Sequence, residues 1–416
     1  MNKFCIYSIL LNLCFISAAI NAKAENDVDW TSFSFEIQNP LPVKRDDLIC
    51  IKDSDVRFDI NNKQGYVVNI NGQLVDSQIT QCFHDNDDLG LAFLYPLNAN
   101  ESQTVNVFIK SGSSIIATSK PKTSAELLVR VGGSWQGNKL HGGNYISVDE
   151  YTVPKDHEIG NKLFKYEGVG WESEQVAYRY YFDERGAIDI FGKQKNGLVL
   201  NEVGIDGDDY HVLDDWGMDI LKVGPSLGLG GIAAWHENKL IGANNFSDLS
   251  VKIAAGNLRS SIAFNYQNWL VDDEKRDLNL TLSISANSLL THVKAETSAQ
   301  VEQFATGIVK HGVEQLHLID KTGTWSYLAT WGKQSLNNDY LGMAIIFKTK
   351  QLSMLSDDKY NEISVFKPLK QPLYYYLAAH WDKSVGGAKN KEQYIKQLQQ
   401  SLAQLNNPVI VKNNIN

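Results

Sequence analysis

The sequence predicts an all-β, antiparallel fold, because hydrophobic and polar residues alternate along much of the 416-residue chain. In "LNLTLSIS" (278–285) every second residue is hydrophobic, which gives a strand one apolar and one polar face. Short polar turns separate such segments in "VAYRYYF-DERG-AIDIFGK" (176–193) and "LHLID-KTG-TWSYLATW" (316–331). An aromatic content of 10% and the scarcity of helical patterns agree with this fold class.

Two domains and one helix are expected within this fold. The Ser-, Lys- and Pro-rich segment 112–125 reads as a linker, so we predict a small N-terminal β domain (25–120) and a large β domain (121–416). Near the C-terminus, Asn390 can cap a helix that ends before Pro408. The apolar stripe of this helix is Tyr394, Ile395, Leu398, Leu402 and Leu405. The Gly- and Asn-rich segment 132–161 shows little periodicity, and such long segments are usually functional or mobile.

The N-terminus has the pattern of a secretory signal peptide. Lys3 precedes a long apolar run, and Ala22-Lys23-Ala24 follows it as an A-x-A cleavage pattern. We expect residues 1–24 to be removed after Ala24, leaving a soluble periplasmic protein without a membrane anchor. The bulky Leu13 before Cys14 argues against a lipoprotein signal.

The net charge and the cysteine content disfavour some classes of partner and cofactor. Of the 39 Lys and Arg residues, two lie in the predicted signal, so 37 basic residues face 48 acidic ones and the mature net charge is −11. This disfavours nucleic acid as a partner but not an anionic sugar that meets a locally basic site. Cys50 and Cys82 remain after export, and an oxidising compartment favours a disulfide between them over two unpaired thiols. No spacing indicates a metal centre, and no cofactor is expected.

The stretch "YHVLDDWGMDILKVGPSLGLGG" (210–231) is the strongest candidate for chemistry. Tyr210 and His211 form a pair suited to proton transfer near neutral pH, and Lys222 can balance an anion. The glycines that follow allow a backbone to approach a ligand closely. The alternative is a bulged loop whose aspartates cap turns.

A second candidate segment is "GVGWESEQVAYRYYF" (168–182). Alternation places Arg179 on a largely apolar face, where it needs an anionic partner. That partner is either structural, such as Asp219, or a ligand carboxylate. Each tryptophan can stack on a sugar or belong to the core. The candidate substrate-binding residues are Trp171, Glu172, Trp216, Asp219, His141 and Arg259.

These segments resemble a domain-of-unknown-function family found in bacterial polysaccharide-utilisation loci. The resemblance covers nearly the whole mature chain. It includes "NPLPVKRDDLICI" (39–51), the two segments above, "AGNLRSSIAFNY" (255–266) and "EQFATGIV" (302–309). The chain departs from the family's pattern at Ser173 and at Asp215-Trp216. The resemblance implies a super-sandwich of the galactose-mutarotase type and work on carbohydrates, and some members are associated with removing water from a terminal uronate.

The resemblance therefore implies a carbon–oxygen lyase that acts by β-elimination on uronate oligosaccharides from ulvan, pectin or alginate, and the candidate residues can be assigned roles in that reaction. Arg179 or Lys222 would neutralise the uronate carboxylate, and His211 and Tyr210 would share the base and acid roles. We therefore expect these four side chains to converge on one concave face. Two alternatives remain: a mutarotase or epimerase that pairs a histidine acid with Asp219 as base, and a non-catalytic glycan-binding protein.

Overall fold

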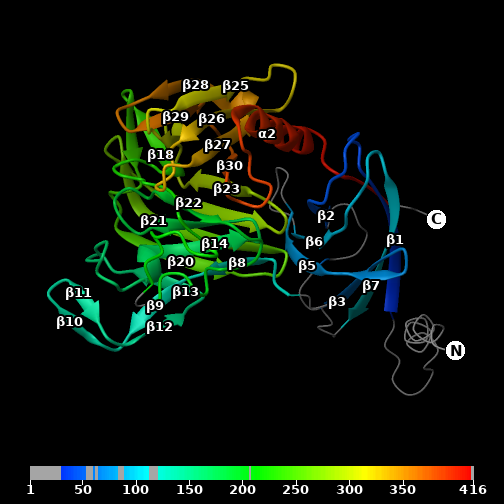
Figure 1. Cartoon of the computed structure of the whole chain (residues 1–416), viewed down its shortest axis with the longest axis horizontal. Coiled ribbons are helices and arrows are strands. Elements are labelled where there is room, and N and C mark those ends of the chain that lie inside the picture. The colour runs from blue at the N-terminus through cyan, green and yellow to red at the C-terminus, as the bar shows by residue number, and fades with distance from the viewer. Residues whose placement is uncertain are drawn as a thin grey trace.

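The computed structural model describes residues 30–52, 60, 64–82, 89–111, 120–205 and 208–413. The predicted signal peptide and most of the predicted linker lie outside these residues. Figure 1 shows a large sandwich, a smaller N-terminal domain beside it, and helix α2 (Lys391–Asn406) on the side of the sandwich that faces the small domain. No helix among the described residues is long and apolar enough to cross a membrane.

The all-β prediction is confirmed. The large domain contains a nine-stranded sheet in the order β13-β20-β21-β22-β23-β30-β27-β26-β25, and every strand pair in it is antiparallel. Its strands are β13 (Glu150–Val153), β20 (Asp248–Ala254), β21 (Arg259–Val271), β22 (Glu274–Ser285), β23 (Leu290–Thr297), β30 (Leu373–Trp381), β27 (Tyr340–Lys348), β26 (Trp325–Lys333) and β25 (Glu314–Leu318).

Two five-stranded sheets form the opposite layer of the sandwich. The first contains β17 (Gly217–Asp219), β16 (Ile188–Lys193), β15 (Val176–Tyr181), β14 (Gly168–Ser173) and β8 (Thr123–Glu126). The second contains β19 (Lys239–Gly242), β18 (Leu229–His236), β24 (Phe304–Val309), β29 (Asn361–Phe366) and β28 (Leu352–Asp357). A parallel bridge between Ile188 and Gly228 joins the two sheets, so they act as one layer over a shared hydrophobic core.

Helix α2 begins and ends where the sequence predicts. The side chain of Asn390 accepts a hydrogen bond from the backbone N–H of Gln393, which caps the first turn. The helix packs on the outer face of the nine-stranded sheet, where the Tyr394 ring stacks on Trp331 at 5.0 Å between centroids. A β-carbon on Gly342 would lie 2.5 Å from the Tyr394 ring, so this close approach needs glycine.

The N-terminal domain combines a five-stranded and a three-stranded sheet. The first contains β31 (Ile410–Asn413), β1 (Trp30–Gln38), β7 (Ser102–Ser111), β3 (Gln64–Ile70) and β4 (Gln73–Val75), and the second β2 (Leu48–Lys52), β6 (Leu89–Leu94) and β5 (Ser77–Gln81). Strand β31 comes from the end of the chain and pairs with β1. The division at residue 120 therefore needs a correction, since the C-terminal strand belongs to the small domain.

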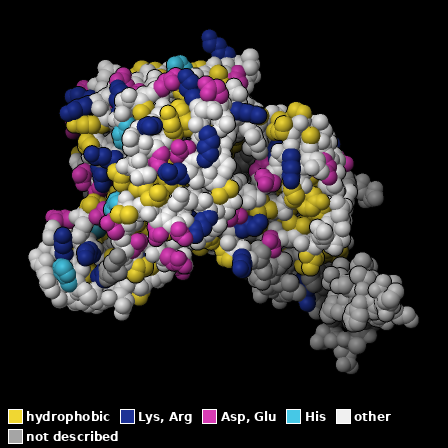
Figure 2. Space-filling model, in the orientation of Figure 1, with side chains coloured by type: hydrophobic (Ala, Val, Ile, Leu, Met, Phe, Trp, Pro, Cys, Tyr) yellow, Lys and Arg dark blue, Asp and Glu magenta, His cyan; other side chains and the backbone are white. Residues whose placement is uncertain are grey.

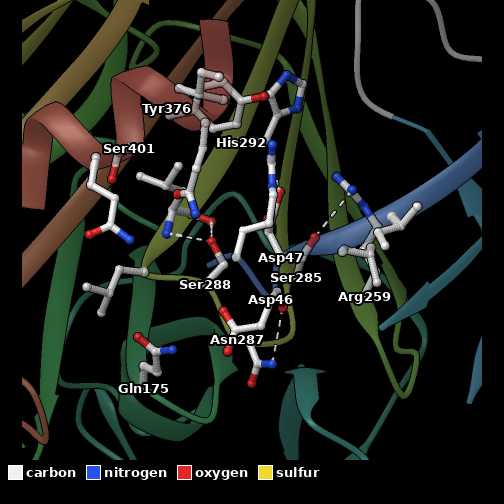
Figure 3. A pocket seen from close by; sticks show the side chains of 18 of the residues that line it. Asp46, Asp47, Gln175, Arg259, Ser285, Asn287, Ser288, His292, Tyr376 and Ser401 are labelled. Carbon is white, nitrogen blue, oxygen red and sulfur yellow. Dashed lines mark hydrogen bonds and ion pairs between the residues drawn. The ribbon is translucent and has the colours of Figure 1, made fainter. Parts of the chain in front are cut away.

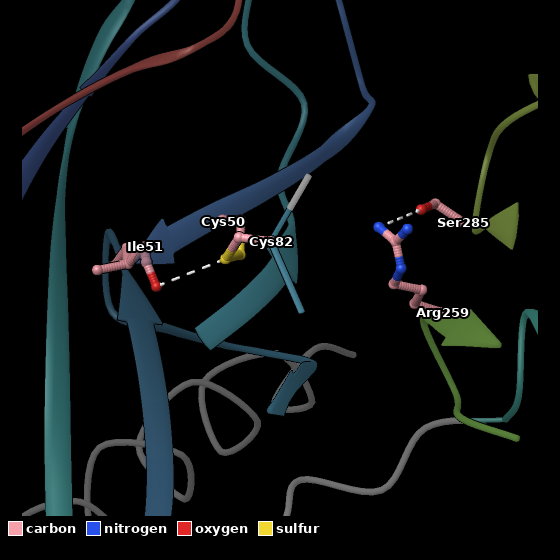
Figure 4. The surroundings of a disulfide bond; sticks show 5 residues. All are labelled: Cys50, Ile51, Cys82, Arg259 and Ser285. Atoms are coloured by element: carbon pink, nitrogen blue, oxygen red, sulfur yellow. Dashed lines mark hydrogen bonds between the residues drawn. A yellow bond between two sulfur atoms is a disulfide. The ribbon is translucent and has the colours of Figure 1, made fainter. Parts of the chain in front are cut away.

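A disulfide joins Cys50 on β2 to Cys82, just after β5, with the Cα atoms 5.9 Å apart. Figure 4 shows this bond on the side of the small domain that faces Arg259. A β-carbon on Gly90 would lie 2.0 Å from the Cys82 sulfur, so the neighbouring strand must carry glycine there. The disulfide thus fixes two strands of the sheet that faces the large domain.

Segment 132–161 is more regular than its sequence suggests. It forms the hairpin β10 (Ser134–Gln136) and β11 (Lys139–His141), then β12 (Asn144–Ser147), which pairs with β9 (Leu128–Val131), and then β13. Glycines with positive φ make the turns: Gly132, Gly133, Gly137, Gly142 and Gly143. Figure 2 shows this hairpin as a projecting lobe, with acidic and basic side chains intermingled over this face of the molecule.

Candidate functional site

Arg179 lies at the centre of a buried ion cluster on the outer face of β15–β17. Its side chain is 2% exposed, and its guanidinium donates to Asp189 and to Asp219, each at 2.6 Å. It also donates to the hydroxyl of Tyr181, and to that of Tyr210 at 3.1 Å. The anionic partner of Arg179 is therefore structural. The two aspartates that occupy this buried guanidinium argue against the predicted role of Arg179 in neutralising a substrate carboxylate.

Tyr210 and His211, which lie in the loop that precedes β17, contact the same ion cluster. The imidazole of His211 is 52% exposed, and its Nε2 lies 3.5 Å from Oδ2 of Asp219. The rings of the two residues lie 4.4 Å apart, and Tyr210 packs edge-on against Phe191. The structure thus brings three of the four predicted catalytic residues together, with Asp219 as their common neighbour.

Lys222 does not join this cluster. Its side chain is exposed, and among the described residues no hydrogen bond or ion pair links its ammonium group to Arg179, Asp219 or His211. Its backbone carbonyl instead accepts a hydrogen bond from His311. The expectation that all four side chains converge is therefore corrected to three.

Asp219 is the most perturbed acid of the cluster. Burial and the neighbouring Asp189 carboxylate raise the pKa of Asp219 to about 8, although Arg179 opposes this rise. A carboxyl group that titrates near neutral pH beside an exposed histidine is a candidate for proton transfer, but structural ion clusters perturb pKa values in the same way.

This raised pKa predicts a pH-dependent stability. Since the pKa of an unfolded aspartate is about 4, the folded state holds an extra proton between pH ~4 and ~8, and stability falls as the pH rises through that window. Asp219→Asn should remove this contribution, so its stability relative to the wild type should increase as the pH rises from ~4 to ~8. Urea unfolding at several pH values measures the difference, and parallel pH profiles for the two proteins would contradict it.

Several predicted substrate-binding residues have structural roles instead. Trp171 lies between the two layers of the sandwich, where its indole N–H donates to Thr291 at 2.9 Å. Glu172 is buried, forms an ion pair with Lys193, and accepts backbone hydrogen bonds from residues 199 and 200. Neither side chain is open to a ligand, because each is enclosed and already satisfied.

The remaining predicted contacts lie in three different places. Trp216 is half-buried beside Phe191 and borders the ion cluster. His141 is exposed on the projecting hairpin. Arg259 lines a cavity between the two domains, which Arg179, Tyr210, His211 and Asp219 do not line.

This interdomain cavity has a volume of about 630 Å³, within the range of small-molecule sites. The sheet of the large domain forms one wall, β2 and residues 45–47 of the small domain form another, and α2 with residues 384–387 forms a third. Figure 3 shows Arg259, His292 and Tyr376 on the walls of the cavity. A smaller cavity of about 210 Å³ lies beyond His292 and Tyr376 and shares both residues.

The strand register explains why these residues meet. Arg259 pairs with Ser285, Ser283 pairs with His292, and His292 pairs with Tyr376, on four successive strands. Cross-strand partners point to the same face of a sheet, and residues two apart on a strand do so as well. Arg259, His292 and Tyr376 therefore share the outer face of the nine-stranded sheet.

The small domain fixes the position of Arg259. The Gln78 side chain donates to the Arg259 carbonyl at 2.9 Å and accepts from the backbone N–H groups of Leu258 and Arg259. The guanidinium of Arg259 is buried, with Ser285 accepting a hydrogen bond at 3.4 Å. Burial lowers the pKa of Arg259, while interaction with Tyr376 opposes that change.

Sequence reasoning missed His292 and Tyr376. They lie on the strands "LTHVKAET" and "LYYYLAAHW", at positions opposite the residues that face the core between the layers. A titratable side chain on the polar face of a strand is the signal that points to them. No group of three or more His, Cys, Asp or Glu residues that could hold a metal occurs in the part of the chain described.

The fold is that of a two-domain, all-β protein with a super-sandwich, and the site is an interdomain cavity lined by both polar and apolar side chains. The chain belongs to the family described as a domain of unknown function, DUF4861, whose model matches residues 37–411. No protein of curated function matches it.

Two solved structures from Enterococcus faecalis are similar at low identity. One is a protein in the Glycosyl Hydrolase Family 38, at 9% identity and a TM-score of 0.40, covering 92% of this chain and 47% of that one. The other is an alpha-mannosidase of strain V583, at 8% identity and a TM-score of 0.42, covering 92% of this chain and 46% of that one. The chain thus spans less than half the length of either structure.

Proposed function

We propose that the protein is a carbohydrate-active lyase or hydro-lyase that acts by β-elimination on uronate oligosaccharides in the interdomain cavity. The observation that carries this proposal is the placement of a buried arginine, a histidine and a tyrosine on one face of the nine-stranded sheet, along one cavity wall. The predicted signal peptide supports export, so we place this activity outside the cytoplasm, most simply in the periplasm.

Arg259 takes the role that the sequence assigned to Arg179. Its guanidinium lines the cavity, and a planar fork of this kind can hold both oxygens of a uronate carboxylate. Neutralising this carboxylate makes the proton at C5 acidic. The same cation then stabilises the enolate-like intermediate, which is the largest electrostatic demand of the reaction.

His292 and Tyr376 share the base and acid roles. They are cross-strand partners with ring centroids 5.0 Å apart, and both line the cavity. One group removes the C5 proton, and the other protonates the oxygen that leaves C4. A water molecule leaves in a dehydratase, and a sugar leaves in a polysaccharide lyase.

Two histidine variants separate this site from the ion cluster. His292→Ala should lower the elimination rate by about 100-fold or more, because a general acid–base group usually contributes that much. His211→Ala should retain most of the rate, since His211 does not line the cavity. The assay is ultraviolet absorbance of the conjugated C4–C5 double bond, on uronate-ended fragments of pectin, alginate and ulvan. A large loss of rate in His211→Ala, with most of the rate kept in His292→Ala, would indicate that the reaction takes place at the ion cluster instead.

A second candidate function is supported by the contact between His211 and Asp219. An exposed imidazole 3.5 Å from a carboxyl group with a raised pKa suits the proton transfers of a mutarotase or epimerase. Anomeric exchange detected by NMR without new absorbance would favour this function. Binding of the fragments with neither signal would favour a glycan-binding protein.

A further inference from the structure

We propose that helix α2 forms a subsite for an uncharged sugar, so that the preferred ligand carries a uronate next to a neutral ring. This inference rests on the proposed function, because it takes Arg259 as the carboxylate site. It further specifies which ring of the ligand follows the uronate, and it places that ring against the opposite wall of the cavity.

The wall that α2 contributes is polar but uncharged. Gln397, Gln400, Ser401 and Gln404 line the cavity, and their spacing of three and four residues places them on one face of the helix. Amide and hydroxyl groups donate and accept hydrogen bonds, as sugar hydroxyls do. Residues 384–387, "SVGG", continue this wall without a charged side chain.

His380, which lines the cavity beside Gln397, is also neutral. Burial lowers the pKa of His380 to about 4, although Gln397 partly opposes the shift by accepting its hydrogen bond at 2.9 Å. Gln397 in turn donates to the carbonyl of Gly386 at 2.8 Å. Two side chains of the wall are thus held in fixed orientations and present no cation to a ligand.

Helix α2 is anchored at both ends, so the subsite is preformed. The cap by Asn390 fixes its start, and Arg45 of the small domain donates to the carbonyl of Asn407 at 2.6 Å, just past its end. The Tyr394 hydroxyl donates to Met343 at 2.9 Å and holds the helix against the sheet. A preformed subsite loses little conformational entropy when a ligand binds.

The charged residues that line the cavity come from elements other than α2, although Arg45 also contacts the carbonyl of Asn407 just past the end of the helix. Arg45 and Asp47 form an ion pair with each other, and Asp46 and Lys52 belong to the small domain's wall. Among the lining residues that the structure describes, those from α2 include no Lys, Arg, Asp or Glu. A second carboxylate or sulfate on the neighbouring ring would therefore be desolvated against amides, and the cation near the end of the helix, Arg45, is already paired with Asp47.

Calorimetric titration of the full mature chain tests this subsite. The probes are glucuronate, an aldobiouronic acid (glucuronate linked to a neutral sugar) and digalacturonate. We expect the aldobiouronic acid to bind about tenfold or more tightly than either other probe. Gln400→Ala combined with Gln404→Ala should reduce its affinity to that of glucuronate, with the glucuronate affinity unchanged.

Gln399→Ala is the matched control, because Gln399 lies on α2 but is exposed and does not line the cavity. It should bind all three probes like the wild type. Gln400→Lys should raise the affinity for digalacturonate, whereas Gln399→Lys should not. If the wild type bound all three probes equally well and Arg259→Ala bound none of them, the subsite on α2 would be ruled out, but the anion site at Arg259 would be supported. Absence of binding to all three would overturn the proposed function and this inference with it.

Discussion

Replacing Arg259 with alanine is expected to lower the rate of uronate elimination by about 100- to 1,000-fold, the loss typical of a group that stabilises developing negative charge. Without this cation the carboxylate stays charged, and the C5 proton is hardly acidic. Arg259→Lys should recover little, since lysine cannot supply the planar fork. The measurement is the initial rate of absorbance of the conjugated double bond.

The control for this variant is a second buried arginine on the same sheet. Arg276 lies near the start of β22, whereas Ser285, the partner of Arg259, lies at its other end. Arg276 bonds to Asp272 and Glu274 and does not line the cavity, so Arg276→Ala should retain activity in its folded fraction. If Arg259→Ala had a normal melting curve and full activity, the proposed mechanism would be contradicted, because it depends most on Arg259.

Removing Arg179 is expected to damage stability rather than ligand binding. Arg179→Met leaves Asp189 and Asp219 buried without their shared cation, and breaking a buried ion pair in this way costs about 3–5 kcal/mol. The free energy of unfolding in urea measures the loss. Adding Asp189→Asn and Asp219→Asn should restore part of it, because the remaining groups are then neutral.

The same variant separates a structural role from a ligand-binding role. If Arg179 held a substrate carboxylate, Arg179→Met would weaken binding of uronate fragments while the unfolding free energy changed by less than about 1 kcal/mol. We expect the reverse: a large loss of stability, and unchanged binding in the protein that remains folded.

Much of the fold could be predicted from local patterns. Alternation such as Leu278, Leu280 and Leu282 identifies a strand and its buried face, because a strand's side chains alternate between two environments. The helix was equally clear, since Asn390 and Pro408 mark its limits. The pairing of β31 with β1 could not be predicted, because the local sequence of a strand does not identify a pairing partner that is distant along the chain.

The candidate site was predictable only in part. An arginine on an apolar face needs an anion, and this argument identified Asp219 as a possible partner of Arg179. It did not reveal Asp189, which completes the neutralisation and closes the guanidinium to ligands. Arg259, His292 and Tyr376 lie on three different strands, and only the order of those strands in the sheet brings them together.

The central claim is that a uronate binds at Arg259 between the two domains. A crystal structure of the His292→Ala variant with a uronate-ended oligosaccharide tests it most directly. We predict that the ligand lies in the interdomain cavity, with its carboxylate on the Arg259 guanidinium and its next ring against α2. A ligand bound over His211 and Trp216, with the interdomain cavity empty, would contradict this account.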